Sequence, residues 1–248
     1  MKDIKYPLSA YIKKKAAEDI FLSKKAGGLR VLLLLGFLVW GSQKLSGYVI
    51  RSSSVPRENG TVKIVIDAGH GGKDGGKVGV DGALESEINL QIANRLKEML
   101  EEDQIEVRMT RTEGREISGT KAEDLRARVA LIDQEQPDLT VSIHQNSYKS
   151  PEIKGAQVFY YTHSKEGKKA AETMQESLKA LDPENTRQAK GNTTYYILKK
   201  TESPVIIVEC GFLSNPEEAE KLCREEYQKK AAECIKSGIF RYLGIDEN

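Results

Sequence analysis

The sequence predicts an α/β fold, in which a mostly parallel or mixed sheet of about six strands carries helices on both faces and forms a single domain. The main observation is that short β-branched runs alternate with amphipathic stretches from about Thr61 to the end of the chain. Such alternation is typical of a sheet that is covered by helices on both faces. A second observation is the composition: 39% of the 248 residues are hydrophobic and 30% are charged, which is typical of a folded protein rather than a disordered one.

The individual elements follow from periodicity. β-branched and apolar runs predict strands at 62–67, 105–109, 139–143, 156–161 and 205–208, with a further short segment at 195–198. A capping-box pattern, Thr120 and Glu123, predicts where the second helix begins, and Gly244 predicts where the last one ends. Apolar residues at helical spacing mark four helices: Ile88, Ile92, Leu96 and Leu100; Leu125, Val129 and Ile132; Ala171, Met174, Leu178 and Leu181; Tyr227, Ala231, Cys234, Ile239 and Leu243.

The N-terminal segment, residues 1–50, differs from the rest of the chain. Many basic residues precede an apolar run at 31–41, which predicts a membrane anchor or an export signal. Because lysine and arginine lie before the run, the N-terminus is expected in the cytoplasm and the remainder outside the membrane. No small-x-small site follows the run, which favours a membrane anchor; an exported and cleaved form is the alternative. Residues 51–60, rich in serine, are expected to be a linker to the domain at 61–248.

Charge and cysteine content exclude several classes of protein. The chain has 38 basic and 37 acidic residues, a net charge of +1, so nucleic acid is not an expected partner. Its 3 cysteines, Cys210, Cys223 and Cys234, form no C-x-x-C pair. A disulfide framework and a zinc ribbon are therefore both excluded as the basis of the fold.

Three residues that can carry chemistry lie at or just after the ends of predicted strands. They are His70, His144 and Glu209. Because working residues in open α/β sheets lie at the carboxyl ends of the strands, we expect these side chains to meet at one edge. The two histidines are a candidate metal pair, although they match no short zinc motif and a structural role stays open. His163 also follows a predicted strand, so position alone does not exclude it as a metal ligand or catalytic residue.

The loop at 71–82 is rich in glycine. Gly71, Gly76 and Lys77 fit the phosphate-binding pattern G-x-x-x-x-G-K, but Val78 stands where a magnesium-binding Ser or Thr is required. Close approach of the backbone to a metal and a substrate explains the glycines better. A loop without a ligand role is the remaining alternative.

Several segments together resemble one enzyme family. They are KIVIDAGHGGKDGG, GALESEINLQIANRL, SIHQNS, GAQVFYY and IIVECGFLSNPEEAEKL, in this order. They are similar to the zinc-dependent N-acetylmuramoyl-L-alanine amidases over about 62–242. The resemblance implies that 61–248 is one catalytic domain, that His70, Glu85 and His144 bind Zn²⁺, and that Glu209 is the catalytic carboxylate.

The chemistry of these residue types agrees with such roles. A catalytic zinc takes three protein ligands and leaves a fourth position to water, and a nearby carboxylate must accept and return a proton. A glutamate that ends an apolar run, as Glu209 does, is costly to bury unless it is paired or functional. The alternative role for Glu209 is a structural ion pair with an arginine such as Arg128. Without the family resemblance, Glu85 is not distinguishable from Glu87.

The resemblance implies hydrolysis of the amide between N-acetylmuramic acid and L-alanine in peptidoglycan. GTKAEDLRARVALI and the basic, apolar N-terminus are most similar to the sporulation type, which acts on spore cortex and supports germination. There the product would pass to a polysaccharide deacetylase that forms the muramic δ-lactam. Two alternatives stay open: a peptidoglycan-binding module that has lost turnover, and a zinc carboxypeptidase that acts on the stem peptide.

Overall fold

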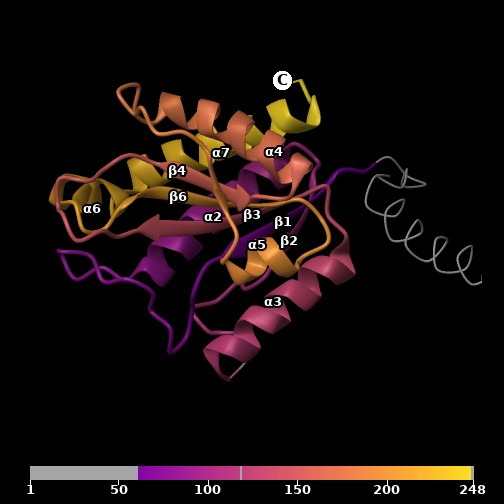
Figure 1. Ribbon diagram of the computed structural model, residues 1–248, viewed down its shortest axis with the longest axis horizontal. Helices are drawn as coiled ribbons and strands as arrows, with labels where there is room; N and C mark the ends of the chain where they lie inside the picture. Colours follow the sequence, from indigo (N-terminus) through magenta and orange to yellow (C-terminus); the bar gives the residue numbers. More distant parts are fainter. Residues whose placement is uncertain (1–60, 118, 247–248) are drawn as a thin grey trace, which may run out of the picture. The chain divides into compact units, whose positions relative to one another are not determined.

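The computed structural model describes residues 61–117 and 119–246, which form a single domain (Figure 1). The expected anchor at 1–50 and linker at 51–60 lie outside the described residues. Within the described ranges, no helix is both long and apolar enough to cross a membrane. The strands are β1 (Lys63–Ala68), β2 (Glu106–Met109), β3 (Leu139–Asn146), β4 (Gln157–Tyr161), β5 (Lys190–Asn192) and β6 (Val205–Phe212). The helices are α2 (Glu85–Glu102), α3 (Lys121–Glu135), α4 (Lys165–Ser177), the 3₁₀ turn η1 (Leu178–Ala180), α5 (Tyr196–Lys200), α6 (Pro216–Leu222) and α7 (Glu225–Leu243).

The strands form one mixed sheet in the order β2-β1-β3-β6-β4-β5. Neighbouring strands are parallel except at one position, where β4 runs antiparallel to β6. The predicted fold class is therefore confirmed.

Helices cover both faces of this sheet, as predicted. In Figure 1, α4 and α7 lie on one side of the strands, and α3 and α5 lie on the other. Alternate residues of β6 follow this division, because Ile206 and Val208 pack in the core that includes α2 and α7. Val205 and Ile207 instead pack with Ile132 of α3 and with residues of α5. Side chains of β6 with odd numbers, Glu209 among them, thus face α3 and α5.

Both predicted helix boundaries agree with the structure. The Thr120 hydroxyl accepts a hydrogen bond from the Glu123 amide, and the Glu123 carboxylate accepts one from the Thr120 amide, so α3 begins with a capping box. Gly244 ends α7 in the left-handed conformation, with φ 71°. Glycine adopts this conformation without a Cβ penalty.

Other elements differ from the prediction. The segment at 195–198 lies within and just before helix α5, and β5 and α6 were not predicted. β5 has the sequence KGN, without β-branched residues, so it is a strand only because it pairs with β4. β3 and β6 extend beyond their apolar runs, since His144 still pairs with Glu209 and Glu209 pairs with Gln157 of β4. These polar residues therefore lie inside strands rather than after them.

A buried ion-pair network joins α3 to β1. The Arg128 side chain is only 2% exposed; its Nη1 donates to Asp67 Oδ1 at 2.7 Å and its Nε donates to Asp124 Oδ2 at 2.6 Å. It also donates to the carbonyl oxygens of Ala68 and His70. Arg128 is thus a structural ion-pair partner, and its carboxylates are Asp67 and Asp124, not Glu209. Its bonds fix the turn that carries His70.

This network predicts a loss of stability in acid. Burial alone would raise the pKa of Asp67, but Arg128 and the Ser142 hydroxyl outweigh it and hold the pKa below the ordinary value. A depressed pKa in the folded state stabilises the protein above the unfolded pKa of about 3.9, and this contribution is lost as the pH falls through the folded value. In Asp67→Asn, the free energy of unfolding at pH 7 should fall by about 3 kcal/mol.

Thermal unfolding of both proteins between pH 7 and pH 2 measures this effect. The gap between wild type and Asp67→Asn should narrow as the pH falls. A gap of the same size at every pH would contradict the linkage to Asp67.

Candidate metal centre and active site

The candidate site lies at the carboxyl edge of the sheet. His70 follows β1, Glu85 begins α2, and His144 and Glu209 are register partners on the parallel strands β3 and β6. Ile143 packs in the core on the α2 side, so His144 points to the other face, as Glu209 does. The four residues predicted from the sequence thus come from four different elements and meet at one edge.

Three of them form a cluster that could hold a metal ion. His70 Nε2 lies 3.2 Å from Glu85 Oε1, and His144 Nδ1 lies 2.9 Å from the same oxygen. The three potential ligand atoms lie within 4.8 Å of one another. Burial would lower the pKa of His144, but the hydrogen bond to Glu85 and the charges of Glu209 and Glu85 raise it above its ordinary value. The cluster combines two imidazoles with one carboxylate.

The glycine-rich loop closes around this cluster. Just before the loop, a Cβ on Gly69 would overlap the imidazole ring of His144. At Gly76, where φ is +72°, a Cβ would lie 2.6 Å from Glu85 Oε2. The Lys77 amide donates to Glu85 Oε2 at 2.8 Å. This loop amide therefore binds a carboxylate of the protein itself, which agrees with close backbone approach and not with a phosphate cradle.

Asp74 orients His70, a role that the sequence analysis missed. Asp74 Oδ2 lies 3.0 Å from His70 Nδ1 and 2.9 Å from Lys121 Nζ. Burial would raise the pKa of Asp74, but His70 and Lys121 lower it to about 2. The carboxylate is therefore ionised at neutral pH and turns Nε2 of His70 toward Glu85. The available signal was an aspartate four residues after a histidine in a glycine-rich loop.

Two more side chains hold the backbone before His70. Asn89 Nδ2 donates to the Gly69 carbonyl oxygen at 3.0 Å. Arg111 Nε donates to the Ala68 carbonyl oxygen at 2.8 Å, and its Nη2 donates to Gly69 and Ser86. Their partners are backbone atoms distant in sequence, so no sequence pattern indicated them.

Glu209 has the environment of a group that can exchange a proton near neutral pH. Its side chain is buried, and Oε2 has no hydrogen-bond partner among the described residues. Burial, together with the charge of Glu85, raises its pKa to about 7, although the charges of His144 and His70 oppose the shift. Such a buried, unpaired carboxylate beside a titratable cluster is a feature of functional sites.

The remaining candidates lie elsewhere. The His163 ring packs edge-on against Tyr161, 5.2 Å between centroids, and is not part of the cluster. Glu87 is exposed, whereas Glu85 is 2% exposed, which separates these two acids. Cys210 is a core residue, and burial raises the pKa of its thiol to about 12.

The mixed α/β sheet and this donor set are typical of a metal-dependent hydrolytic enzyme, because two imidazoles and a carboxylate leave a further position for reactants. Comparison with known proteins is more specific. The N-acetylmuramoyl-L-alanine amidase family matches residues 64–241, and the chain belongs to this family. The family resemblance inferred from the motifs is confirmed.

Individual relatives agree with this assignment. The germination-specific N-acetylmuramoyl-L-alanine amidase of Bacillus subtilis (strain 168) is 41% identical over 188 residues, which cover 73% of this chain and 79% of the relative. Among solved structures, the CwlD amidase from Clostridioides difficile in complex with the GerS lipoprotein is 34% identical, with a TM-score of 0.72 over 75% of this chain and 100% of that one. The catalytic domain of the amidase CwlV from Bacillus (Paenibacillus) polymyxa is 29% identical, with a TM-score of 0.68 over 75% of this chain and 100% of that one.

Proposed function

We propose that this amidase is zinc-dependent and that His70, Glu85 and His144 bind the ion. The observation that carries the proposal is the convergence of two imidazole nitrogens and one carboxylate oxygen within 4.8 Å of one another. This donor set fits zinc, which prefers nitrogen and carboxylate ligands and needs three of them in catalytic sites. The unpartnered Oε2 of Glu209 beside the cluster supports a reaction centre rather than a structural site.

Several residues of the chain then have separate roles in hydrolysis. When bound, zinc lowers the pKa of water and polarises the scissile carbonyl. Asp74 keeps the His70 ring oriented, and the Lys77 amide does the same for Glu85. Glu209 accepts a proton from the attacking water and delivers it to the departing nitrogen of L-alanine. Its raised pKa, about 7, suits a group that must both take and give a proton near neutral pH.

The proposed substrate is spore cortex peptidoglycan, and the proposed role is cortex maturation for germination. Support comes from the 41% identity to the germination-specific amidase of Bacillus subtilis. The product, muramic acid without its peptide, is the substrate that a polysaccharide deacetylase needs in order to form the muramic δ-lactam. The complex of the Clostridioides difficile relative with a lipoprotein supports a lipoprotein partner for this chain as well.

Mass spectrometry of the digestion products tests the reaction. Peptidoglycan treated with the zinc-loaded protein should release peptides with a free N-terminal L-alanine and leave muramic acid without peptide. A zinc carboxypeptidase would instead shorten the peptide at its other end, and a binding module would leave the polymer unchanged. Either of these two results would refute the proposed reaction.

We also propose that residues 1–50 tether the enzyme to the outer side of the membrane. The support is the basic segment followed by the apolar run 31–41, without a good cleavage site. The full-length protein should therefore sediment with membranes, and a chain that starts at Thr61 should not. Recovery from cells of only a shortened soluble protein, with a new N-terminus between residues 41 and 60, would favour the exported and cleaved form.

A further inference from the structure

Arg187 is hydrogen-bonded to β4, the strand that lies beside the proposed catalytic Glu209 of β6. Gln157 of β4 is the antiparallel register partner of Glu209, so both side chains lie on the same face of the sheet. Arg187 Nη1 donates to Gln157 Oε1 at 3.1 Å. His144, Glu209, Gln157 and Arg187 therefore follow one another across the carboxyl edge of the sheet.

Arg187 is held rigidly in this position. Its Nε donates to the Lys154 carbonyl oxygen at 2.8 Å, and its guanidinium carbon lies 4.7 Å from the centre of the Phe212 ring. The buried Asn185 accepts a hydrogen bond from the Arg187 amide and donates one to the Ala156 carbonyl oxygen. The guanidinium is thus fixed before any ligand arrives, which lowers the entropic cost of binding.

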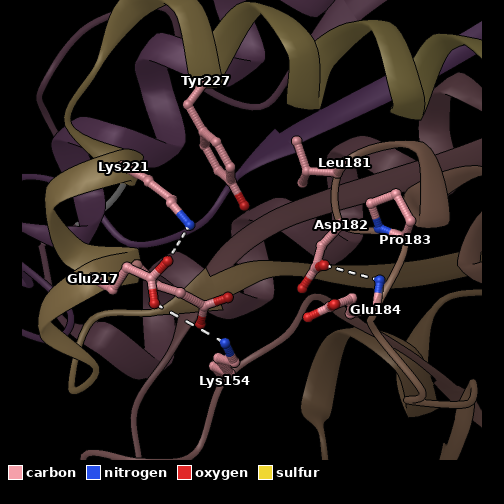
Figure 2. A pocket seen from close by; sticks show the side chains of 9 residues that line it. Lys154, Leu181, Asp182, Pro183, Glu184, Glu217, Lys221 and Tyr227 are labelled. Atoms are coloured by element: carbon pink, nitrogen blue, oxygen red, sulfur yellow. Dashed lines mark hydrogen bonds and ion pairs between the residues drawn. The ribbon is translucent and has the colours of Figure 1, made fainter.

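The charge of Arg187 is not neutralised by any residue that the structure describes. Among the described residues, no carboxylate pairs with its guanidinium, whose partners are a carbonyl, an amide oxygen and an aromatic ring. In the adjacent surface pocket, by contrast, the lysine side chains are paired with a carboxylate. Figure 2 shows Lys221 bonded to Glu217 at 2.6 Å, with Lys154 4.0 Å from the same carboxylate. A fixed, half-buried and unpaired guanidinium is a binding group for a carboxylate.

The order of the residues indicates which part of the substrate reaches Arg187. The proposed metal ligands lie on the β1 and β3 side of Glu209, and Arg187 lies on the β4 side. In the proposed function Glu209 protonates the departing nitrogen, so a peptide that extends from Glu209 away from the metal ligands runs toward β4. The strands β6 and β4 are about 4.8 Å apart, and Arg187 Nη1 lies 3.1 Å from the Gln157 side chain on β4. Two residues of extended peptide span about 7 Å.

We propose that Arg187 determines substrate specificity by binding a free carboxylate on the residue that follows L-alanine in the stem peptide. This inference rests on the proposed amidase function. Arg187 contributes to binding and does not take part in proton transfer, so it should affect KM more than kcat.

Two matched substrates test the inference: disaccharide peptides that differ only in whether the residue after L-alanine has a carboxylate or a carboxamide. For the wild type, kcat/KM should be higher for the carboxylate by about 10- to 100-fold, the effect expected for one charge-assisted hydrogen bond. Arg187→Gln should raise KM for the carboxylate substrate by this factor, leave kcat nearly unchanged and abolish the preference. The matched control is Lys154→Gln, which removes a cation that lies beside Arg187 and is paired with Glu217. This variant should keep the wild-type preference for the carboxylate substrate.

Three other results would each overturn the inference, and they can be told apart. A wild type that cleaves both substrates equally well would overturn it without any variant, and would leave the amidase function intact. An Arg187→Gln protein that loses rate equally on both substrates, or melts lower with its preference intact, would show a structural role and overturn it too. A wild type that cleaves neither substrate would refute the proposed function itself, and the inference with it.

Discussion

Replacement of Glu209 by glutamine should lower the amidase rate by about 10² to 10⁴ while zinc stays bound, because general acid–base catalysis contributes that much. The amide keeps the shape of the side chain but neither accepts a proton from water nor donates one to the leaving nitrogen. Since Glu209 Oε2 has no partner among the described residues, the substitution breaks no hydrogen bond of that oxygen. The fold should therefore persist.

Zinc content, melting temperature and rate, measured on the same preparation, test this expectation. Glu87→Gln is the matched control, because Glu87 is an exposed acid near the start of α2. The wild-type rate should also fall in acid, where Glu209 becomes protonated. Because burial raises the pKa of Glu209 from the ordinary value of 4.5, this fall should occur at a higher pH than for an exposed glutamate. An unchanged rate in Glu209→Gln would remove this residue from the mechanism.

Replacement of His144 by alanine should weaken zinc binding by more than about 100-fold and abolish turnover. Loss of a residue that only hydrogen-bonds a metal ligand already costs about 10- to 100-fold in affinity, and loss of the ligand itself should cost more. Titration with a zinc-sensitive chelator measures the affinity independently of catalysis.

His163→Ala is the control for His144→Ala. His163 is the third histidine of the chain, and its ring packs against Tyr161 outside the cluster. This variant should keep wild-type zinc affinity and activity. Zinc loss in His163→Ala together with full occupancy in His144→Ala would mean that the ligand assignment is wrong.

The layered sheet and most of its helices could be predicted because they depend on local patterns. Apolar residues in β1, β3 and β6 are buried on both faces, and the helix residues Ile88, Ile92 and Leu96 have no exposed surface or almost none. β5 and the ends of β3 and β6 could not be predicted. These segments are strands because of hydrogen bonds to neighbouring strands, which the local sequence does not encode.

The candidate site could likewise be predicted only in part. Strand ends alone indicated His70, His144 and Glu209, and the family motifs added Glu85. The structure brings all four together at the predicted edge. Asp74, Asn89 and Arg111 were missed, because each acts through a hydrogen bond to a ring nitrogen or a backbone carbonyl, and neither partner leaves a periodic signal.

The pairing of β3 with β6 has a consequence for how activity arises during folding. His144 and Glu209 become neighbours only when these two parallel strands pair, and β4 and β5 lie between them in the sequence. Contacts between such distant segments form slowly, because a long loop must close before they stabilise the chain. In a chain that is incomplete before β6, or not yet folded there, the histidines are present without Glu209 beside them. Amidase activity should therefore appear only after β3 and β6 have paired.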